Sequence, residues 1–144
     1  MIKTIILFLF INPFLNSSDL KKVASYSISN YGNERYESFG FWINNKNKQI
    51  IHYRYGKDDK EVPVKYLGKS QLNGEVAFKI LIDNKITLYA TQEGDKLRLR
   101  NLSGTYNKLF LWTYEGPVNG IGTYCEPCTQ DEEESKSFLS KYYF

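Results

Sequence analysis

The feature that most constrains this chain is a sustained alternation of apolar and polar residues between positions 75 and 115. Phe78, Ile80 and Ile82 alternate with Lys79 and Leu81, and the same period of two returns after each of three short polar turns. Side chains of a β-strand point to opposite faces in turn, so this pattern is typical of strands that bury one face. The segment predicts four consecutive antiparallel strands.

The residues upstream continue the same rhythm. Four further strands are predicted near 24–29, 37–44, 48–55 and 62–67. Pro63 lacks a backbone donor and indicates a sheet edge or a bulge, and 68–74 reads as a loose connection. About eight strands at this spacing favour an all-β meander that forms a barrel, with a two-sheet sandwich as the alternative. In a barrel, the strand near Tyr26 should pair with the strand near Trp112.

The two ends of the chain have a different composition. Residues 1–18 join a short basic start to an apolar run that Asn12-Pro13 interrupts, which is the layout of a secretory signal peptide. We therefore expect an exported protein, secreted or periplasmic and without stable membrane anchoring after cleavage, with one β domain over 19–144. That domain divides into strands over 19–116, a Gly-rich linker over 117–128 and a helical C-terminal region over 129–144.

The C-terminal helix is predicted from about residue 130 to 142. Thr129 followed by Glu132 has the spacing of a capping box, and acidic residues follow in the first turn. Phe138, Leu139 and Tyr142 lie on one helical stripe, which we expect to pack against the sheet.

Charge excludes one class of partner. The chain has 19 Lys and Arg residues against 16 Asp and Glu, a formal net charge of +3, and no clustered basic face. A nucleic-acid interface needs such a face. We therefore expect a protein or a small apolar molecule as the partner, and no nucleic acid.

The cysteine pair is the one motif with chemistry of its own. Cys125-Glu-Pro-Cys128 resembles the C-x-P-C active site of thioredoxin-like oxidoreductases, which implies thiol-disulfide exchange by these two residues. Five acidic residues surround the motif and oppose the formation of a thiolate. In an exported protein a structural disulfide between Cys125 and Cys128 is the favoured interpretation.

Other chemistry has little support in the sequence. His52 is the single histidine, and Asp58-Asp59 lacks the alternating spacing of a calcium loop. No nucleophile elbow, paired-carboxylate motif or zinc-binding His pair is present. We expect no catalytic residue, no metal and no cofactor.

The aromatic excess motivates the functional hypothesis. The chain contains 12 Tyr, 9 Phe and 2 Trp, and Trp42, Tyr53, Tyr55 and Trp112 lie on strands where they can line a barrel mouth or a docking face. We therefore predict a non-enzymatic binding module. The alternatives are a thiol-disulfide redox protein that uses Cys125 and Cys128, and a structural envelope protein without a pocket.

Overall fold

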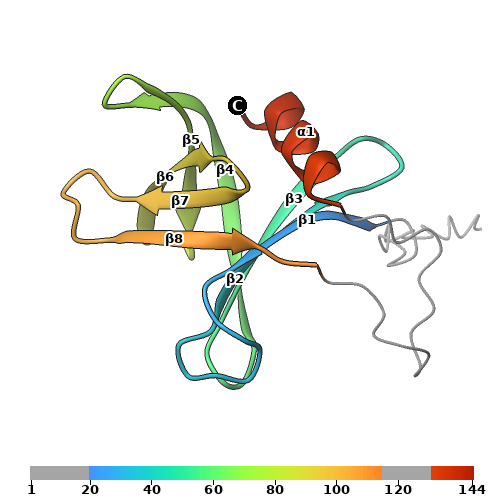
Figure 1. The fold of residues 1–144 in the computed structure, drawn as a ribbon, viewed down its shortest axis with the longest axis vertical. Helices are drawn as coiled ribbons and strands as arrows, with labels where there is room; N and C mark the ends of the chain where they lie inside the picture. Colours follow the sequence, from blue (N-terminus) through green and yellow to red (C-terminus); the bar gives the residue numbers. More distant parts are fainter. Residues whose placement is uncertain (1–19, 115–130) are drawn as a thin grey trace, which may run out of the picture.

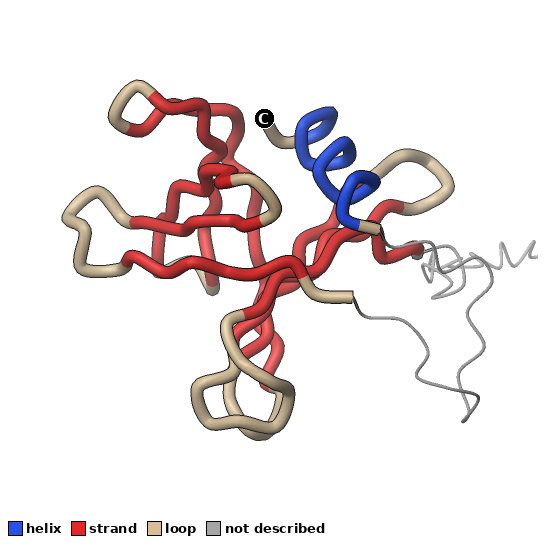
Figure 2. The backbone as a smooth tube through the Cα atoms, in the orientation of Figure 1, coloured by secondary structure: helices blue, strands red, loops and turns tan. Residues whose placement is uncertain are grey.

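The computed structural model describes residues 20–114 and 131–144 as eight strands and one helix (Figure 1). The strands, red in Figure 2, form a closed antiparallel barrel in which each one pairs with the next along the chain. The elements are β1 (Lys21–Ser27), β2 (Glu37–Ile43), β3 (Gln49–Tyr55), β4 (Lys60–Leu72), β5 (Glu75–Ile82), β6 (Ile86–Glu93), β7 (Lys96–Arg100), β8 (Asn107–Trp112) and α1 (Glu132–Tyr142).

The pairing of β1 with β8 closes the barrel and confirms the prediction. Tyr26 is the register partner of Trp112, and Ser27 is the partner of Leu111. This seam is only two residues long, but it leaves neither strand as a free edge at this point. It also decides for the barrel and against the two-sheet sandwich.

Large apolar side chains fill the barrel. The alternation seen in the sequence places their rings and branched chains on the inner face, where each is at most 1% exposed: Tyr26, Phe39, Phe41, Phe78, Ile80, Leu88, Leu97, Leu99 and Phe110. Phe39 stacks edge-to-face on Phe110, and Phe41 meets Phe78 in the same way. Such contacts add about 0.5–1.5 kcal/mol per pair to the burial itself.

The connection between β4 and β5 differs from the prediction. The sequence suggested a short strand over 62–67 and a loose segment over 68–74, but β4 is a single strand of 13 residues. It turns directly into β5 through Asn73 and Gly74, whose φ values are +51° and +81°. Asn-Gly is a preferred pair for this tight hairpin turn. A bulge between Tyr66 and Gly68 breaks the regular pairing with β5, and this break hid the strand in the sequence pattern.

The helix also begins later than expected. Asp131, rather than Thr129, is the N-cap, and its side chain accepts a hydrogen bond from the backbone N–H of Glu134 at 2.6 Å. Thr129 itself lies outside the described residues. Ser135 donates to the carbonyl of Val23 on β1 at 3.1 Å.

The residue after the helix completes the packing. Tyr143 is 2% exposed, and its ring lies 5.1–5.3 Å from those of Phe41, Tyr66 and Phe78. The Tyr66 hydroxyl donates to the carbonyl of Tyr143 at 2.9 Å. The C-terminal segment thus inserts a ring among the inward-facing aromatics at one end of the barrel.

Candidate functional site

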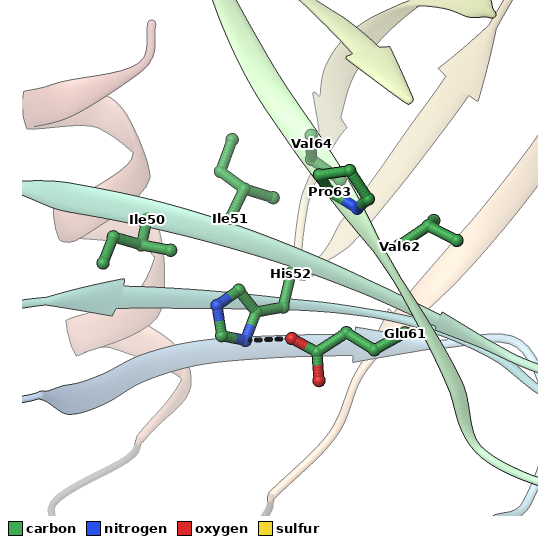
Figure 3. Close-up of a pocket in the computed structure, with 7 residues that line it drawn as sticks. All are labelled: Ile50, Ile51, His52, Glu61, Val62, Pro63 and Val64. Carbon is green, nitrogen blue, oxygen red and sulfur yellow. Dashed lines mark ion pairs between the residues drawn. The ribbon is translucent and has the colours of Figure 1, made fainter. Parts of the chain in front are cut away.

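Strands β3 and β4 separate part of the way along their length. They are paired from Tyr55 with Lys60 to His52 with Pro63. Beyond this point, in the described chain, β3 pairs with β2 and β4 pairs with β5, and no register joins β3 to β4. Pro63 is the last residue of β4 in this ladder, and its carbonyl accepts from the N–H of Asp83, so its side without an N–H faces β5 rather than β3. Figure 3 shows the two strands diverging on one side of this point.

The divergence leaves a cleft in the barrel wall, which we call the β3–β4 cleft. It consists of two adjoining hollows of about 440 and about 270 Å³ that share Ile50, Ile51 and Val64. Pockets that bind small ligands usually have volumes of about 300–1,000 Å³ and mostly apolar walls. The first hollow is completed by His52, Glu61, Val62 and Pro63, and the second by Lys48, Gln49, Tyr66 and Tyr143.

A charged cluster marks the end of the cleft at which the strands are paired. Nδ1 of His52 lies 3.0 Å from Oε1 of Glu61, as Figure 3 shows. Nδ1 makes no hydrogen bond, so the contact is an electrostatic one that gains strength when the imidazole is protonated. Arg54 lies 3.4 Å from Glu61 and 3.5 Å from Asp59. Glu61 is therefore already occupied by two neighbours.

Trp42 extends the outer wall beside this cluster. Its ring is 5.8 Å from that of His52, and the ammonium of Lys22 is 5.2 Å from the Trp42 ring. Gly40 leaves room for these side chains, because a Cβ at this position would stand 3.0 Å from Cε of Lys22 and 3.1 Å from Nε1 of Trp42 and would displace them slightly. The predicted binding residue Trp42 thus lies on the outside of the barrel, next to His52 of the β3–β4 cleft.

The diverging end of the cleft contains a basic side chain, Lys48, and a buried tyrosine, Tyr143. Lys48 and Tyr143 both line the second hollow. The Tyr143 hydroxyl is buried and has no hydrogen-bond partner among the described residues. Burial raises the pKa of this phenol well above its usual range, and the neighbouring Tyr66 adds to the shift. The group is therefore neutral at physiological pH.

Tyr53 and Tyr55 lie elsewhere, on the inner face of β3. Their rings are stacked with centroids 5.6 Å apart. Burial raises the pKa of Tyr53, and the carboxylate of Glu37 raises it further. Glu37 also accepts from Tyr106 at 3.0 Å and pairs with Lys108. The polar groups of Glu37, Tyr53, Tyr106 and Lys108 therefore pair with one another, and they leave no open site for a ligand.

Trp112 has a structural contact. Its indole N–H donates to the Ser135 hydroxyl at 2.9 Å and so ties β8 to α1. The four aromatic residues predicted to bind are therefore found in three places: Trp42 beside the cleft, Tyr53 and Tyr55 at the Glu37 cluster, and Trp112 under the helix.

Of the residues that line the cleft, sequence reasoning singled out only His52 and Pro63. Ile50, Val64 and Lys48 look like ordinary strand and turn residues, and the pairing of His52 with Glu61 depends on the β3–β4 register. The one available signal was Pro63, which indicated an edge. It marked the end of the ladder correctly, although the hollow beyond it depends on the path of both strands.

Several predictions fall on residues that the structure does not describe. Cys125 and Cys128 lie in 115–130, and the predicted signal peptide lies in 1–19. The disulfide, the redox alternative and export therefore stay predictions. Within 20–114 and 131–144, no group of three or more His, Cys, Asp or Glu side chains is arranged to hold a metal ion. None of the helical segments in these two ranges has the length and apolar character that a membrane span requires.

Comparison with known proteins identifies no relative. No protein-family model, no curated protein and no solved structure matches the chain.

Proposed function

We propose that this chain is an exported, non-enzymatic binding module that holds its ligand in the β3–β4 cleft. One observation carries the proposal. The barrel interior is filled by packed rings, whereas the opening between β3 and β4 leaves a mostly apolar hollow in contact with solvent. The core aromatics are explained by their packing inside the barrel. The β3–β4 cleft is apolar but exposed to solvent, so packing does not explain it, and a concave apolar surface of this kind is typical of a ligand site.

The chemistry of the cleft supports binding rather than catalysis. Its polar groups are the His52 imidazole beside Glu61 at one end and the Lys48 ammonium at the other. No Ser, Thr or Cys lines either hollow, so a nucleophile next to His52 is missing from the lining residues. The apolar middle would contribute affinity, and the polar ends would orient a ligand.

A neutral fluorescent probe, N-phenyl-1-naphthylamine, tests whether the cleft binds apolar molecules. We expect its emission to rise on binding to the wild-type protein. Ile50→Glu places a charge where the two hollows meet and should weaken binding at least about tenfold. A factor of ten is about 1.4 kcal/mol, less than the roughly 1.5–3 kcal/mol gained when an Ile side chain is fully buried.

Leu111→Glu is the matched control. Leu111 is 49% exposed on β8 and lines neither hollow of the cleft, so this variant introduces the same charge without touching the site. Both variants should melt within a few degrees of the wild type. Equal probe binding by the Ile50→Glu and Leu111→Glu variants, or a wild type that binds neither the probe nor any peptide, would contradict the proposal.

A further inference from the structure

The unpaired strand edges in the β3–β4 cleft indicate what kind of ligand fits there; this inference rests on the proposed function. Gln49, Ile50 and Ile51 are paired with β2 on one side only. Val64 and Tyr66 are likewise paired with β5 alone. In a strand, alternate residues direct their N–H and C=O groups to opposite edges. Some backbone donors and acceptors of both strands therefore point toward the cleft without a strand partner.

The length of the free edge is limited on both strands. On β3 it covers the three residues from Gln49 to Ile51, which is about 10 Å at 3.3 Å per residue. On β4 the regular part runs from Val64 to Tyr66, where the bulge before Gly68 interrupts it. The two edges thus have matching lengths, and each can pair with about three residues of an extended chain.

The backbone groups favour a peptide over a simple hydrocarbon chain. A hydrocarbon in the cleft would cover N–H and C=O groups without replacing their hydrogen bonds to water, which is costly. A peptide strand supplies both donors and acceptors along its length. Strand addition to a free sheet edge uses these bonds for affinity and uses pockets for alternate side chains for selectivity.

The side chains of the cleft define the sequence of such a peptide. Ile50, Ile51 and Val64 form the common apolar middle, which suits small aliphatic side chains at alternate positions. Lys48 lines the diverging end, and its ammonium has no carboxylate within 4 Å among the residues that the structure describes. An acidic group at this end of the ligand would complement it.

We propose that the occupant of the β3–β4 cleft is an extended peptide segment that adds to the free edge of β3, with aliphatic residues at alternate positions and an acidic residue near Lys48. The His52–Glu61 pair closes the opposite end, where Glu61 is already engaged by His52 and Arg54. The acidic residue is therefore oriented toward the diverging end.

A random heptapeptide library displayed on phage tests this inference with the whole protein as bait. Peptides that also bind the Ile50→Glu variant are removed, and the Leu111→Glu variant serves as the positive control. We expect enrichment of peptides with alternating aliphatic residues and an Asp or Glu on one side of them. No enrichment over Ile50→Glu, or enrichment of basic peptides, would overturn the inference.

Backbone methylation of the best synthetic peptide tests the mode of binding. N-methylation at the amides that face β3 should weaken binding at least tenfold, and methylation at the alternate amides should leave it nearly unchanged. Replacing the acidic residue by its amide and Lys48 by Gln should each weaken binding several-fold, with little further loss when they are combined. A peptide that tolerates methylation at every amide does not bind as a strand, and the inference would then be wrong.

The two proposals fail in different ways. If the naphthylamine probe binds in the cleft but no peptide is enriched, the ligand is a small apolar molecule, and only the peptide inference falls. If neither binds, the proposed function itself is contradicted. If the protein self-associates in sedimentation experiments and Ile50→Glu abolishes this, the edge serves a second copy of the chain and the peptide inference is again wrong.

Discussion

The contribution of Tyr143 to stability can be separated into two opposing parts. Its ring is in contact with three other aromatic rings and is 2% exposed, but its hydroxyl is buried without a partner. Truncating a buried Phe or Trp to Ala usually costs about 3–5 kcal/mol, and Tyr143 has a ring of similar size and burial. We expect Tyr143→Ala to lower the free energy of unfolding by this amount, out of a total of roughly 5–15 kcal/mol for a domain.

The hydroxyl should act in the opposite direction. A buried donor without a partner costs about 1–3 kcal/mol, so Tyr143→Phe keeps the ring contacts and removes the penalty. We expect Tyr143→Phe to be as stable as the wild type or more stable, by up to about 1 kcal/mol after relaxation. Urea denaturation followed by fluorescence of Trp42 and Trp112 measures both variants on the same scale.

One result would refute this reasoning. If Tyr143→Phe loses more than about 1 kcal/mol, the hydroxyl has a hydrogen-bond partner in solution, because a typical intramolecular hydrogen bond contributes about that much. Tyr66→Phe is the control variant: it removes the bond to the Tyr143 carbonyl and should be destabilised by about 0.5–1.5 kcal/mol.

Three further predictions concern other parts of the molecule. Burial, with the Glu37 carboxylate adding to the shift, raises the pKa of Tyr106. Its contribution to stability should therefore be constant below about pH 10 and fall above it, by at most about 1.4 kcal/mol per pH unit, in addition to the contributions of the other buried tyrosines. Tyr106→Phe should flatten this slope in urea titrations at pH 9–11.5, and an unchanged slope would count against it. Asp131→Ala should destabilise by about 0.5–2 kcal/mol through loss of the N-cap, whereas Asp131→Asn, measured in the same assay, should retain most of the stability. Gly40→Ala should displace the Trp42 indole and shift its emission, and an unaltered spectrum would contradict the close contact.

Much of the fold could be predicted because each strand buries one face. The inward positions of Phe39, Phe41 and Phe78 follow from a period of two, and Tyr26 and Trp112 pair where the barrel interpretation required. The helix stripe of Phe138 and Leu139 was also predicted correctly, since both are buried.

The remaining features depend on interactions between distant residues. The bulge at Tyr66–Gly68 disrupted the alternation of β4, so the Asn73-Gly74 turn was not recognised. Tyr143 continues the stripe four residues after Leu139, but it follows the last helical residue, and it is the residue that fills the barrel end. A helical stripe predicts that such a residue is buried, and it gives no signal about which rings the residue will meet.

The candidate site was harder to predict than the fold. Aromatic residues were chosen because they are frequent at binding surfaces, but Tyr53 faces the Glu37 cluster and Trp112 binds Ser135. The β3–β4 cleft arises from where one ladder stops. Strand register depends on two segments together, and in the sequence only Pro63 indicated that the pairing of β4 is interrupted.

Amide chemical-shift mapping with N-phenyl-1-naphthylamine tests the central claim most directly, because it locates the bound molecule without any substitution. The account predicts that the largest shifts fall on residues 48–52 and 61–66, on both sides of the β3–β4 cleft. Shifts centred on Glu37, Tyr53 and Tyr106, or on Trp112 and α1, would place the ligand elsewhere and contradict the account.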